Sequence, residues 1–259
     1  MTLAMNVRLS AREIVELFHL HFLRVLTTGV DKRLVVVEGG CNLRFFFASP
    51  RYSEDLELDI EVVAKTTLQK NVERALQSRA LRVPLTRWGV SVGDVSAPKQ
   101  TETTQRWKVG LVVDDTLPLR TKIEFSRRTR KEPAAADPID EVVARRYDLV
   151  RHVLTHYRGP EAFVQKIRAL SGRPTTQARD VFDIHWLLTT AGSKLAVPSD
   201  VRHESLSLAV ERVIGLSFDQ YRAQVVAYLD ADAAERYGAR LFFEQMQDEV
   251  LRALEALAP

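Results

Sequence analysis

Residues 55–63 read DLELDIEVV, and their acidic and apolar side chains alternate as far as Val62. A period of two is typical of a β-strand with one polar face and one buried face. Neighbouring acids on the polar face lie about 7 Å apart, which costs roughly 2 kcal/mol of repulsion per pair at an effective dielectric of 20. A solvated face tolerates that cost, whereas a face lining a cleft would attract a cation, and this strand alone leaves both interpretations open. The acids are Asp55, Glu57, Asp59 and Glu61.

A second alternating stretch, KIEFS, carries Glu124 on its polar face. If this stretch forms a strand beside the first, Glu124 supplies a third carboxylate near Asp55 and Glu57. Carboxylate oxygens are the ligands that hard divalent cations prefer. The alternative is a salt bridge from Glu124 to Lys122 or Arg120 on its own strand face.

The acidic strand is preceded by a glycine pair, Gly39 and Gly40, and then by CNLRFFFA, which reads as a short helix at 41–48. A break that leads into a helix exposes backbone N–H groups at the helix start, where phosphate is favoured. A glycine pair alone is weak evidence. Its position directly before a short helix and an acidic strand favours a nucleotide site much more strongly.

Local patterns predict the remaining elements. Ser10 and Glu13 form a capping box that opens a helix ending at about residue 28. We expect further helices at 65–81, 140–146 and 231–257, and strands at 89–95, 106–113 and 119–126. Residues 34–37 read as either a short buried strand or the end of a helix. Residues 127–138 read as a connection that ends the β-rich half, 149–157 is ambiguous, and from Pro160 onward the signals are nearly all helical. We therefore predict an α/β domain over residues 1–158 and a helical lobe over residues 159–259.

The composition is that of an ordinary globular protein, with 46% hydrophobic and 27% charged residues. No stretch approaches 18 consecutive apolar residues and the N-terminus lacks a signal-peptide pattern, so we expect a cytoplasmic protein without a membrane segment. Cys41 is the single cysteine, which excludes an internal disulfide and a cysteine-based zinc site. His152 and His156 lie four apart and could share a helix face, but no third ligand stands near them. We interpret both, and His185, as structural.

The net charge of +3 is unevenly distributed. Residues 142–179 hold eight basic side chains against two acidic ones, so this segment carries +6 and the rest of the chain −3. A basic segment beside an acidic region suits a polyanionic partner such as NTP phosphates or RNA. A solvated basic helix surface would explain the charge equally well. The basic residues are Arg145, Arg146, Arg151, Arg158, Lys166, Arg168, Arg173 and Arg179.

Two motifs in this order resemble those of a known family. Residues 38–44 (EGGCNLR) followed by 49–57 (SPRYSEDLE) resemble the AbiEii/AbiGii nucleotidyltransferase toxin family, which includes the MenT toxins. Residues 166–170 (KIRAL) followed by 179–185 (RDVFDIH) look like that family's second conserved segment. With the KIE strand, the resemblance extends over roughly residues 35–190.

The resemblance implies a polymerase-β-like nucleotidyltransferase domain with a mixed sheet, followed by a helical lobe. It also implies Mg²⁺ or Mn²⁺ ions that clamp the triphosphate of an NTP substrate and activate the attacking oxygen. Carried over by position, the metal ligands are Asp55, Glu57 and Glu124; the catalytic residues are Asp55, Glu57, Lys166 and Asp180; and the nucleotide-binding residues are Gly39, Gly40, Ser53, Lys166 and Asp183.

Some positions depart from the family pattern. Cys41 stands where Thr or Ser is usual, and Glu57 stands where Asp is usual, which lengthens that ligand by one methylene. Asp59 could therefore replace Glu57 as a ligand. In the helical lobe, Lys166 alone could be a solvated helix lysine. Asp180 and Asp183, three apart on one helix face, could simply pair with Arg173 or Arg179.

The leading hypothesis is an RNA-modifying toxin of a toxin–antitoxin system, associated with phage defence, that adds nucleotides to the 3′ end of tRNA and blocks translation. It would take NTP, RNA and a cognate antitoxin as partners. The same chemistry on a protein or small-molecule hydroxyl is a second hypothesis. A non-catalytic binding module that keeps the fold is a third.

Overall fold

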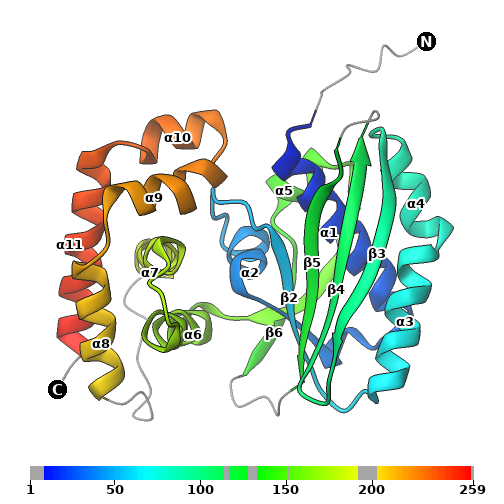
Figure 1. Ribbon diagram of the computed structural model, residues 1–259, viewed down its shortest axis with the longest axis horizontal. Coiled ribbons are helices and arrows are strands. Elements are labelled where there is room, and N and C mark those ends of the chain that lie inside the picture. The colour runs from blue at the N-terminus through cyan, green and yellow to red at the C-terminus, as the bar shows by residue number, and fades with distance from the viewer. Residues whose placement is uncertain (1–8, 114–116, 128–132, 151, 192–202, 258–259) are drawn as a thin grey trace.

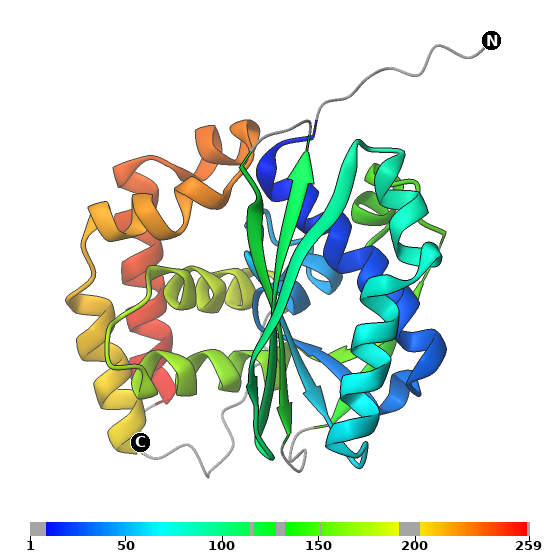
Figure 2. The same ribbon diagram turned by 45° about the vertical axis from the view of Figure 1, so that its right-hand side comes forward.

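The computed structural model describes residues 9–113, 117–127, 133–150, 152–191 and 203–257. A seven-stranded mixed sheet in the order β3-β4-β5-β2-β1-β7-β6 runs through the middle of the described part. Three helices, α1, α3 and α4, cover one face of this sheet, and the helices from α6 onward lie on the other side (Figures 1 and 2). The short helix α2 lies between the sheet and that helical part.

The elements of the sheet and its covering helices come first in the chain. They are α1 (Ala11–Gly29), the 3-10 turn η1 (Lys32–Leu34), β1 (Val35–Glu38), α2 (Gly39–Phe46), β2 (Asp55–Ile60), α3 (Lys65–Gln77), α4 (Arg79–Thr86), β3 (Val90–Gln100), β4 (Thr104–Val113), β5 (Leu119–Arg127), β6 (Ala134–Pro138), α5 (Glu141–Arg146) and β7 (Val153–Tyr157). The helical part follows, with α6 (Gly159–Gly172), α7 (Ala178–Ala191), α8 (His203–Ile214), α9 (Phe218–Gln224), η3 (Val226–Tyr228), α10 (Ala231–Tyr237) and α11 (Arg240–Leu257).

Helix α1 begins at the predicted capping box. The backbone N–H of Glu13 donates to Ser10 Oγ at 3.4 Å, and the backbone N–H of Ser10 donates to Glu13 Oε2 at 2.7 Å. Each bond satisfies an N–H group that the helix itself leaves without a partner. The apolar stripe that follows packs on the sheet, and Leu17, Phe18 and Phe22 are fully buried. Local sequence therefore fixes both the start and the orientation of this helix.

Two groups of buried apolar side chains form the interior. The first lies between the sheet and α1, α3 and α4, and it includes Leu56, Leu58 and Ile60 of β2. The second lies among the helices from α6 to α11 and also includes Leu43 of α2. With its apolar side chains turned to the first core, β2 directs its acids to the opposite face, toward the helical part. A division into two domains at residues 158/159 stays a prediction.

Two strands depart from the sequence-based prediction. Residues 127–138 were expected to be a connection that ends the β-rich half, but Ala134–Pro138 form β6. The ambiguous stretch contains β7, which pairs in parallel with β1 and antiparallel with β6. An alanine-rich segment ending in proline has a weak strand propensity, so pairing with a distant strand decides its conformation.

Three other elements end earlier than predicted. β2 stops at Ile60, and Val62 has φ 61°, a left-handed conformation that breaks the strand. The helix expected at 65–81 divides at Ser78, whose Oγ accepts the N–H of Leu81 at 3.2 Å and so caps α4. The long final helix divides at Gly238, where a Cβ would lie 2.3 Å from the carbonyl oxygen of Ala234.

None of the helices formed by the described residues is both long enough and apolar enough to cross a membrane.

Candidate active site

Register places the predicted acids of two strands side by side. β2 and β5 pair in parallel, with Glu57 beside Glu124 and Asp55 beside Lys122. On the other side of β2, Glu57 pairs with Glu38 of β1. Three glutamates, Glu38, Glu57 and Glu124, thus form one row across neighbouring strands, on the sheet face toward the helical part. We call this row the acid row. The expectation that Glu124 lies beside Glu57 agrees with this geometry.

Basic side chains of the same face neutralise two of these acids. Lys122 Nζ lies 2.7 Å from Asp55 Oδ2, and the Lys122 backbone N–H donates to Asp55 Oδ1 at 3.2 Å. Arg106 of β4 donates to Glu124 Oε2 at 2.5 Å. Glu124 therefore does form a salt bridge, as one sequence interpretation allowed, but its partner is Arg106 on the neighbouring strand.

The donor set suits a hard divalent cation because every candidate ligand is a carboxylate oxygen. Asp55 and Glu124 keep 24% and 27% of their side-chain surface exposed, so a cation can reach them. Among the described residues, however, no three His, Cys, Asp or Glu side chains converge into a ready-made cluster. A cation shared by these acids would require Asp55 and Glu124 to turn away from Lys122 and Arg106.

The start of α2 lies directly against Glu57. Gly39 has φ 66°, and a Cβ built there would lie 2.0 Å from Glu57 Oε2. At Gly40 a Cβ would lie 2.8 Å from Ser53 Oγ and 3.0 Å from a guanidinium nitrogen of Arg51. The N-cap residue of α2, Glu38, makes no side-chain cap hydrogen bond, so its carboxylate does not compete with an anion for the first N–H groups of the helix. The two glycines therefore allow the start of α2 to lie close to the side chains of Glu57, Ser53 and Arg51.

Cys41 and His19 are buried side chains that form a chain of contacts to the backbone of β2. Cys41 Sγ lies 3.4 Å from the carbonyl oxygen of Asp55 and 3.7 Å from His19 Nδ1. Burial raises the pKa of the Cys41 thiol, so Cys41 stays neutral and unreactive. Thr121 Oγ1 donates to the carbonyl oxygen of Glu54 at 2.7 Å and must therefore accept from His19 Nε2 at 2.7 Å. His19 thus carries its proton on Nε2.

Asp59, which the sequence left open as a substitute ligand, lies away from the acid row. It is 3% exposed and accepts a hydrogen bond from the hydroxyl of Tyr157 at 2.5 Å. Because β2 packs Asp59 against β7, a cation would have to displace that buried bond to reach it. The geometry favours Glu57 over Asp59 as the partner of Asp55.

The predicted residues of the helical part form one buried ion network. Lys166 of α6 lies 2.7 Å from Asp183 and 3.5 Å from Asp180, both on α7. Asp180 also accepts from Arg173 at 2.9 Å, as the sequence interpretation allowed. Lys166 keeps only 10% of its side chain exposed, so it is no solvated helix lysine. Burial alone would lower the pKa of Lys166, but the carboxylates of Asp183 and Asp180 raise it, and the amine stays charged.

Arg51 joins this network to the start of α2. Its guanidinium holds both carboxylate oxygens of Asp183, at 2.9 and 3.0 Å from one nitrogen and 3.1 Å from another. Burial would raise the pKa of Asp183, but Arg51 and Lys166 hold it below its usual range. The same guanidinium lies beside Gly40. Sequence reasoning assigned Arg51 no role, although it stands inside the SPRYSED motif.

A comparison with known protein families finds a match over most of the chain. Residues 21–246 match the family described as nucleotidyl transferase AbiEii toxin, type IV TA system. The chain belongs to the AbiEii nucleotidyltransferase toxin family. It is therefore a nucleotidyltransferase of a toxin–antitoxin family. No protein of curated function matches it.

Two solved structures share the fold. A candidate nucleotidyltransferase from H. pylori superposes with a TM-score of 0.56 and 18% identity, covering 92% of this chain and 96% of that one. The nucleotidyltransferase toxin MenT4 from Mycobacterium tuberculosis gives a TM-score of 0.57 and 15% identity, covering 98% and 97%. The predicted α/β fold with a mixed sheet and a helical C-terminal part is confirmed.

The basic segment at 142–179 does not form a single free surface. Four of its cations pair with carboxylates: Arg145 with Glu141, Arg146 with Glu13, Arg173 with Asp180, and Lys166 with Asp180 and Asp183. Arg151 lies outside the described residues. The segment is therefore weaker evidence for a polyanionic partner than its composition indicated.

The three histidines interpreted as structural have partners away from the acid row. His152 lies 3.3 Å from Thr27 Oγ1, and His185 lies 2.9 Å from Glu249. The ring of His156 stacks on Phe46, with centroids 3.8 Å apart. His152 and His156 do not share a helix face because His156 lies on β7.

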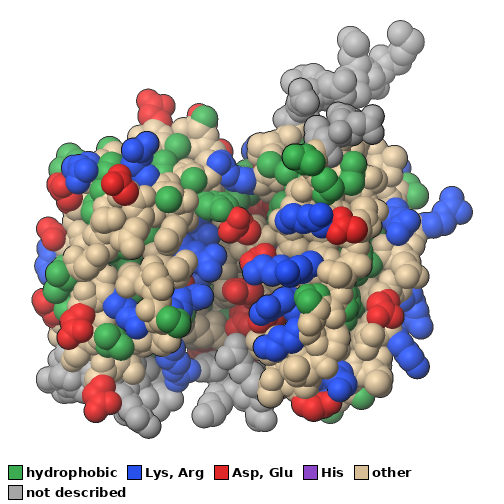
Figure 3. All heavy atoms as spheres, viewed as in Figure 1, with side chains coloured by type: hydrophobic (Ala, Val, Ile, Leu, Met, Phe, Trp, Pro, Cys, Tyr) green, Lys and Arg blue, Asp and Glu red, His purple; other side chains and the backbone are tan. Residues whose placement is uncertain are grey.

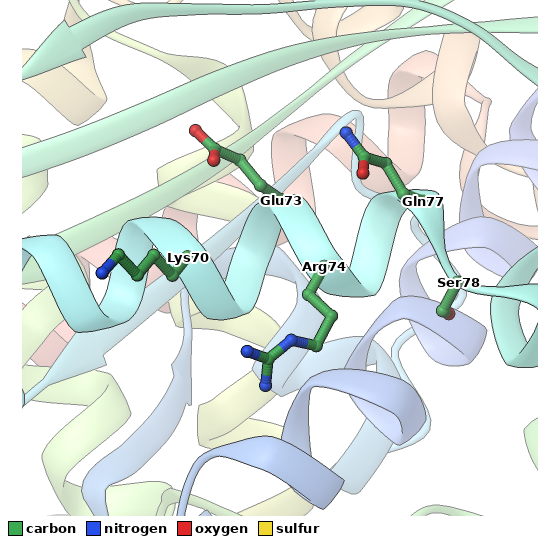
Figure 4. A pocket seen from close by; sticks show the side chains of 5 residues that line it. All are labelled: Lys70, Glu73, Arg74, Gln77 and Ser78. Carbon is green, nitrogen blue, oxygen red and sulfur yellow. The ribbon is translucent and has the colours of Figure 1, made fainter.

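The surface shows where a substrate could enter. Figure 3 shows a hollow between the helical part and the sheet, with acidic side chains inside it and Lys and Arg side chains along its sheet side. A separate shallow pocket on α3, shown in Figure 4, is lined by Lys70, Glu73, Arg74, Gln77 and Ser78. Helix α3 covers the other face of the sheet, so that pocket is separate from the hollow.

Proposed function

We propose that this protein transfers a nucleoside monophosphate from an NTP to RNA, at the 3′ acceptor end of tRNA, and thereby inhibits translation. The observation that carries the proposal is the packing of Glu57 against the uncapped start of α2, one strand away from Glu124. This packing brings carboxylates for a cation and N–H groups for a phosphate to one place. Family membership supports the same reaction class.

Asp55, Glu57 and Glu124 would hold the divalent cations, Mg²⁺ or Mn²⁺. Such cations, when bound, neutralise the triphosphate and favour in-line attack by a hydroxyl with pyrophosphate as leaving group. The chain's own contribution is to hold three carboxylates on two strands whose backbone hydrogen bonds fix their spacing. Lys122 and Arg106 neutralise Asp55 and Glu124 until a cation arrives.

The triphosphate would lie across the start of α2. The N–H groups of Gly40 and its neighbours would donate to phosphate oxygens, and the helix dipole favours the negative charge. Ser53, whose hydroxyl donates to the carbonyl oxygen of Asp55 at 2.9 Å, would line the loop beside Gly40. Lys166 would supply a compact positive charge from the opposite side. Arg51 connects these two groups, since it touches Gly40 and holds Asp183.

Asp180 and Asp183 act as positioning residues in this proposal. Both side chains are fully buried, with 0% exposure, and both face cations of the protein. A general base must reach the proton that it removes, and a sealed carboxylate cannot. We therefore propose that Asp180 positions Lys166 and Arg173. We do not assign it the role of general base, which the sequence had left open.

Incubation of the protein with labelled NTPs, Mg²⁺ and total tRNA tests the reaction. Label on RNA is expected with the wild type. A change of Glu57→Gln is expected to lower the rate by about 100-fold or more, because it removes one of the negative charges that would hold the cation on the triphosphate. The matched change Glu73→Gln, on the exposed side of α3, should leave the rate unchanged. No label on RNA with active wild-type protein would contradict the proposal.

The same experiment separates the other candidates. Label on protein, or on neither polymer despite pyrophosphate release, would assign the chemistry to a different acceptor. Growth arrest on expression, relieved by Asp55→Ala or Lys166→Ala and by a co-expressed antitoxin, would link the reaction to toxicity. Arrest that persists in both variants would instead point to a non-catalytic binding role.

A further inference from the structure

The sheet face beside the acid row carries a cluster of basic side chains. We name Lys99, Arg106, Lys108, Arg120 and Lys122 the basic strip. We propose that the basic strip binds the sugar–phosphate backbone of the acceptor RNA and leads its end to Asp55 and Glu57. This proposal rests on the proposed function and adds the surface that the acceptor occupies.

Strand register makes the basic strip continuous with the acid row. Lys99 of β3 pairs with Arg106 of β4, and Arg106 pairs with Glu124 of β5, which itself lies beside Glu57. Partners across a strand pair point to the same face. One row therefore runs from Lys99 on the edge strand to Glu57 on β2, beside the start of α2.

A second row of paired residues on the same face also runs from basic residues to an acidic one. Ser96 of β3 pairs with Lys108 of β4, Lys108 with Lys122 of β5, and Lys122 with Asp55 of β2. Figure 3 shows Lys and Arg side chains following the acidic ones out of the hollow on this side. Acids at one end and bases at the other suit a polyanion whose reacting end meets the acids.

The charge of the basic strip is available to a partner. Lys99 and Lys108 are exposed, and no described carboxylate pairs with either. Arg120 pairs with Asp94 at the surface, where such a bridge is weak. Lys122 and Arg106 would be freed for phosphate whenever Asp55 and Glu124 turn to a cation.

The length of the basic strip indicates a polymer. β3 lies three strands from β2, which is about 14 Å at the usual strand spacing. A triphosphate at the start of α2 and Lys166 would leave this distance uncovered. A nucleic-acid strand, with phosphates at regular intervals, would cover it.

The side chains on this face favour RNA over a protein partner. Between Thr104 and Gly110, the residues of β4 that face outward are Arg106 and Lys108, while Trp107 is buried on the other face. Protein interfaces need a dehydrated apolar or aromatic centre, and this strand offers none. Contacts limited to phosphates would be indifferent to base sequence.

Binding of fluorescently labelled total tRNA, without NTP, tests the proposal across a salt series. The variant pair Lys99→Gln and Lys108→Gln removes two phosphate contacts, so the slope of log affinity against log salt should fall by about 1.4–1.8. The advantage of wild type over this variant should therefore shrink about tenfold between 50 and 200 mM salt. The matched pair Lys70→Gln and Arg74→Gln on exposed α3 should bind like wild type.

Three results would overturn the assignment. The Lys99/Lys108 variant could bind tRNA like wild type at every salt concentration, or both variant pairs could lose affinity equally. Wild type could also bind polyglutamate as tightly as tRNA, which would show a general anion surface.

Transfer of label to RNA by the Lys99/Lys108 variant with unchanged RNA affinity would leave the proposed function intact. Normal strip-dependent RNA binding without label transfer would contradict the proposed function alone.

Discussion

Replacing Gly39 by alanine tests the contact on which the proposed site depends. Gly39 has φ 66°, and an L-residue in that region costs about 1–2 kcal/mol. The new methyl group would also start 2.0 Å from Glu57 Oε2, although Cβ contacts under 3.0 Å essentially do not occur. The carboxylate must therefore move by at least 1 Å.

Two readouts follow from these two effects. The backbone cost should lower the melting temperature by about 2–8 °C, at 2–4 °C per kcal/mol for a protein of this size. The displaced carboxylate should lower the rate of nucleotidyl transfer about 100-fold, the usual effect of a 1 Å misplacement. The control Gly172→Ala, at the end of α6 with nothing within 4 Å, should change neither quantity for the worse.

A double variant separates the carboxylate from general damage. If Gly39→Ala acts through Glu57, adding it to Glu57→Gln should cost little further activity, because residues in contact are not additive. The reasoning fails if the two losses multiply. It fails equally if Gly39→Ala keeps full activity while the melting temperature falls.

Three further predictions concern buried groups. Burial lowers the pKa of His19 to about 3, below its unfolded value of 6.5. As the pH falls through this range, the unfolded state takes up the proton first, so the free energy of unfolding decreases. Protonation of His19 in the unfolded state lowers the free energy of unfolding at pH 5 by about 2 kcal/mol. His19→Gln should therefore reduce the difference in unfolding free energy between pH 7 and pH 5 by about that amount, and an unchanged difference would refute the prediction. Tyr157→Phe removes the donor to Asp59 and should cost about 2 kcal/mol of stability in urea denaturation while activity stays within about twofold; a large loss of activity would bring Asp59 back as a ligand. Lys166→Met leaves Asp183 with Arg51 and Asp180 with Arg173, so it should cost about 3 kcal/mol and abolish any NTP-dependent rise in melting temperature; a retained rise would remove Lys166 from the nucleotide site.

Sequence reasoning was strongest where the signal is local. The capping box at Ser10 and the alternation around Glu57 each depend on residues within a few positions of one another, and both agree with the structure. The pairing of Glu57 with Glu124 was inferred from two matching polar faces, although 67 positions separate these residues.

The weaker inferences depended on contacts between distant parts of the chain. β6 and β7 exist because they pair with each other and with β1, which their own residues do not reveal. Asp183 pairs with Arg51, 132 positions away, whereas the alternative interpretation from sequence considered only the nearby Arg173 and Arg179. The positive charge at 142–179 looked like a surface because the carboxylates that neutralise it, such as Glu13, lie elsewhere in the sequence.

The two outer strands of the sheet have a consequence for assembly. β3 and β6 are its open edges, and each contains a proline, Pro98 and Pro138, which has no N–H to offer an incoming strand. β3 is further interrupted by two register shifts and carries Lys99. Such features discourage edge-to-edge addition of another chain. We therefore expect a binding protein to contact this chain through side chains and not as an added strand of the sheet.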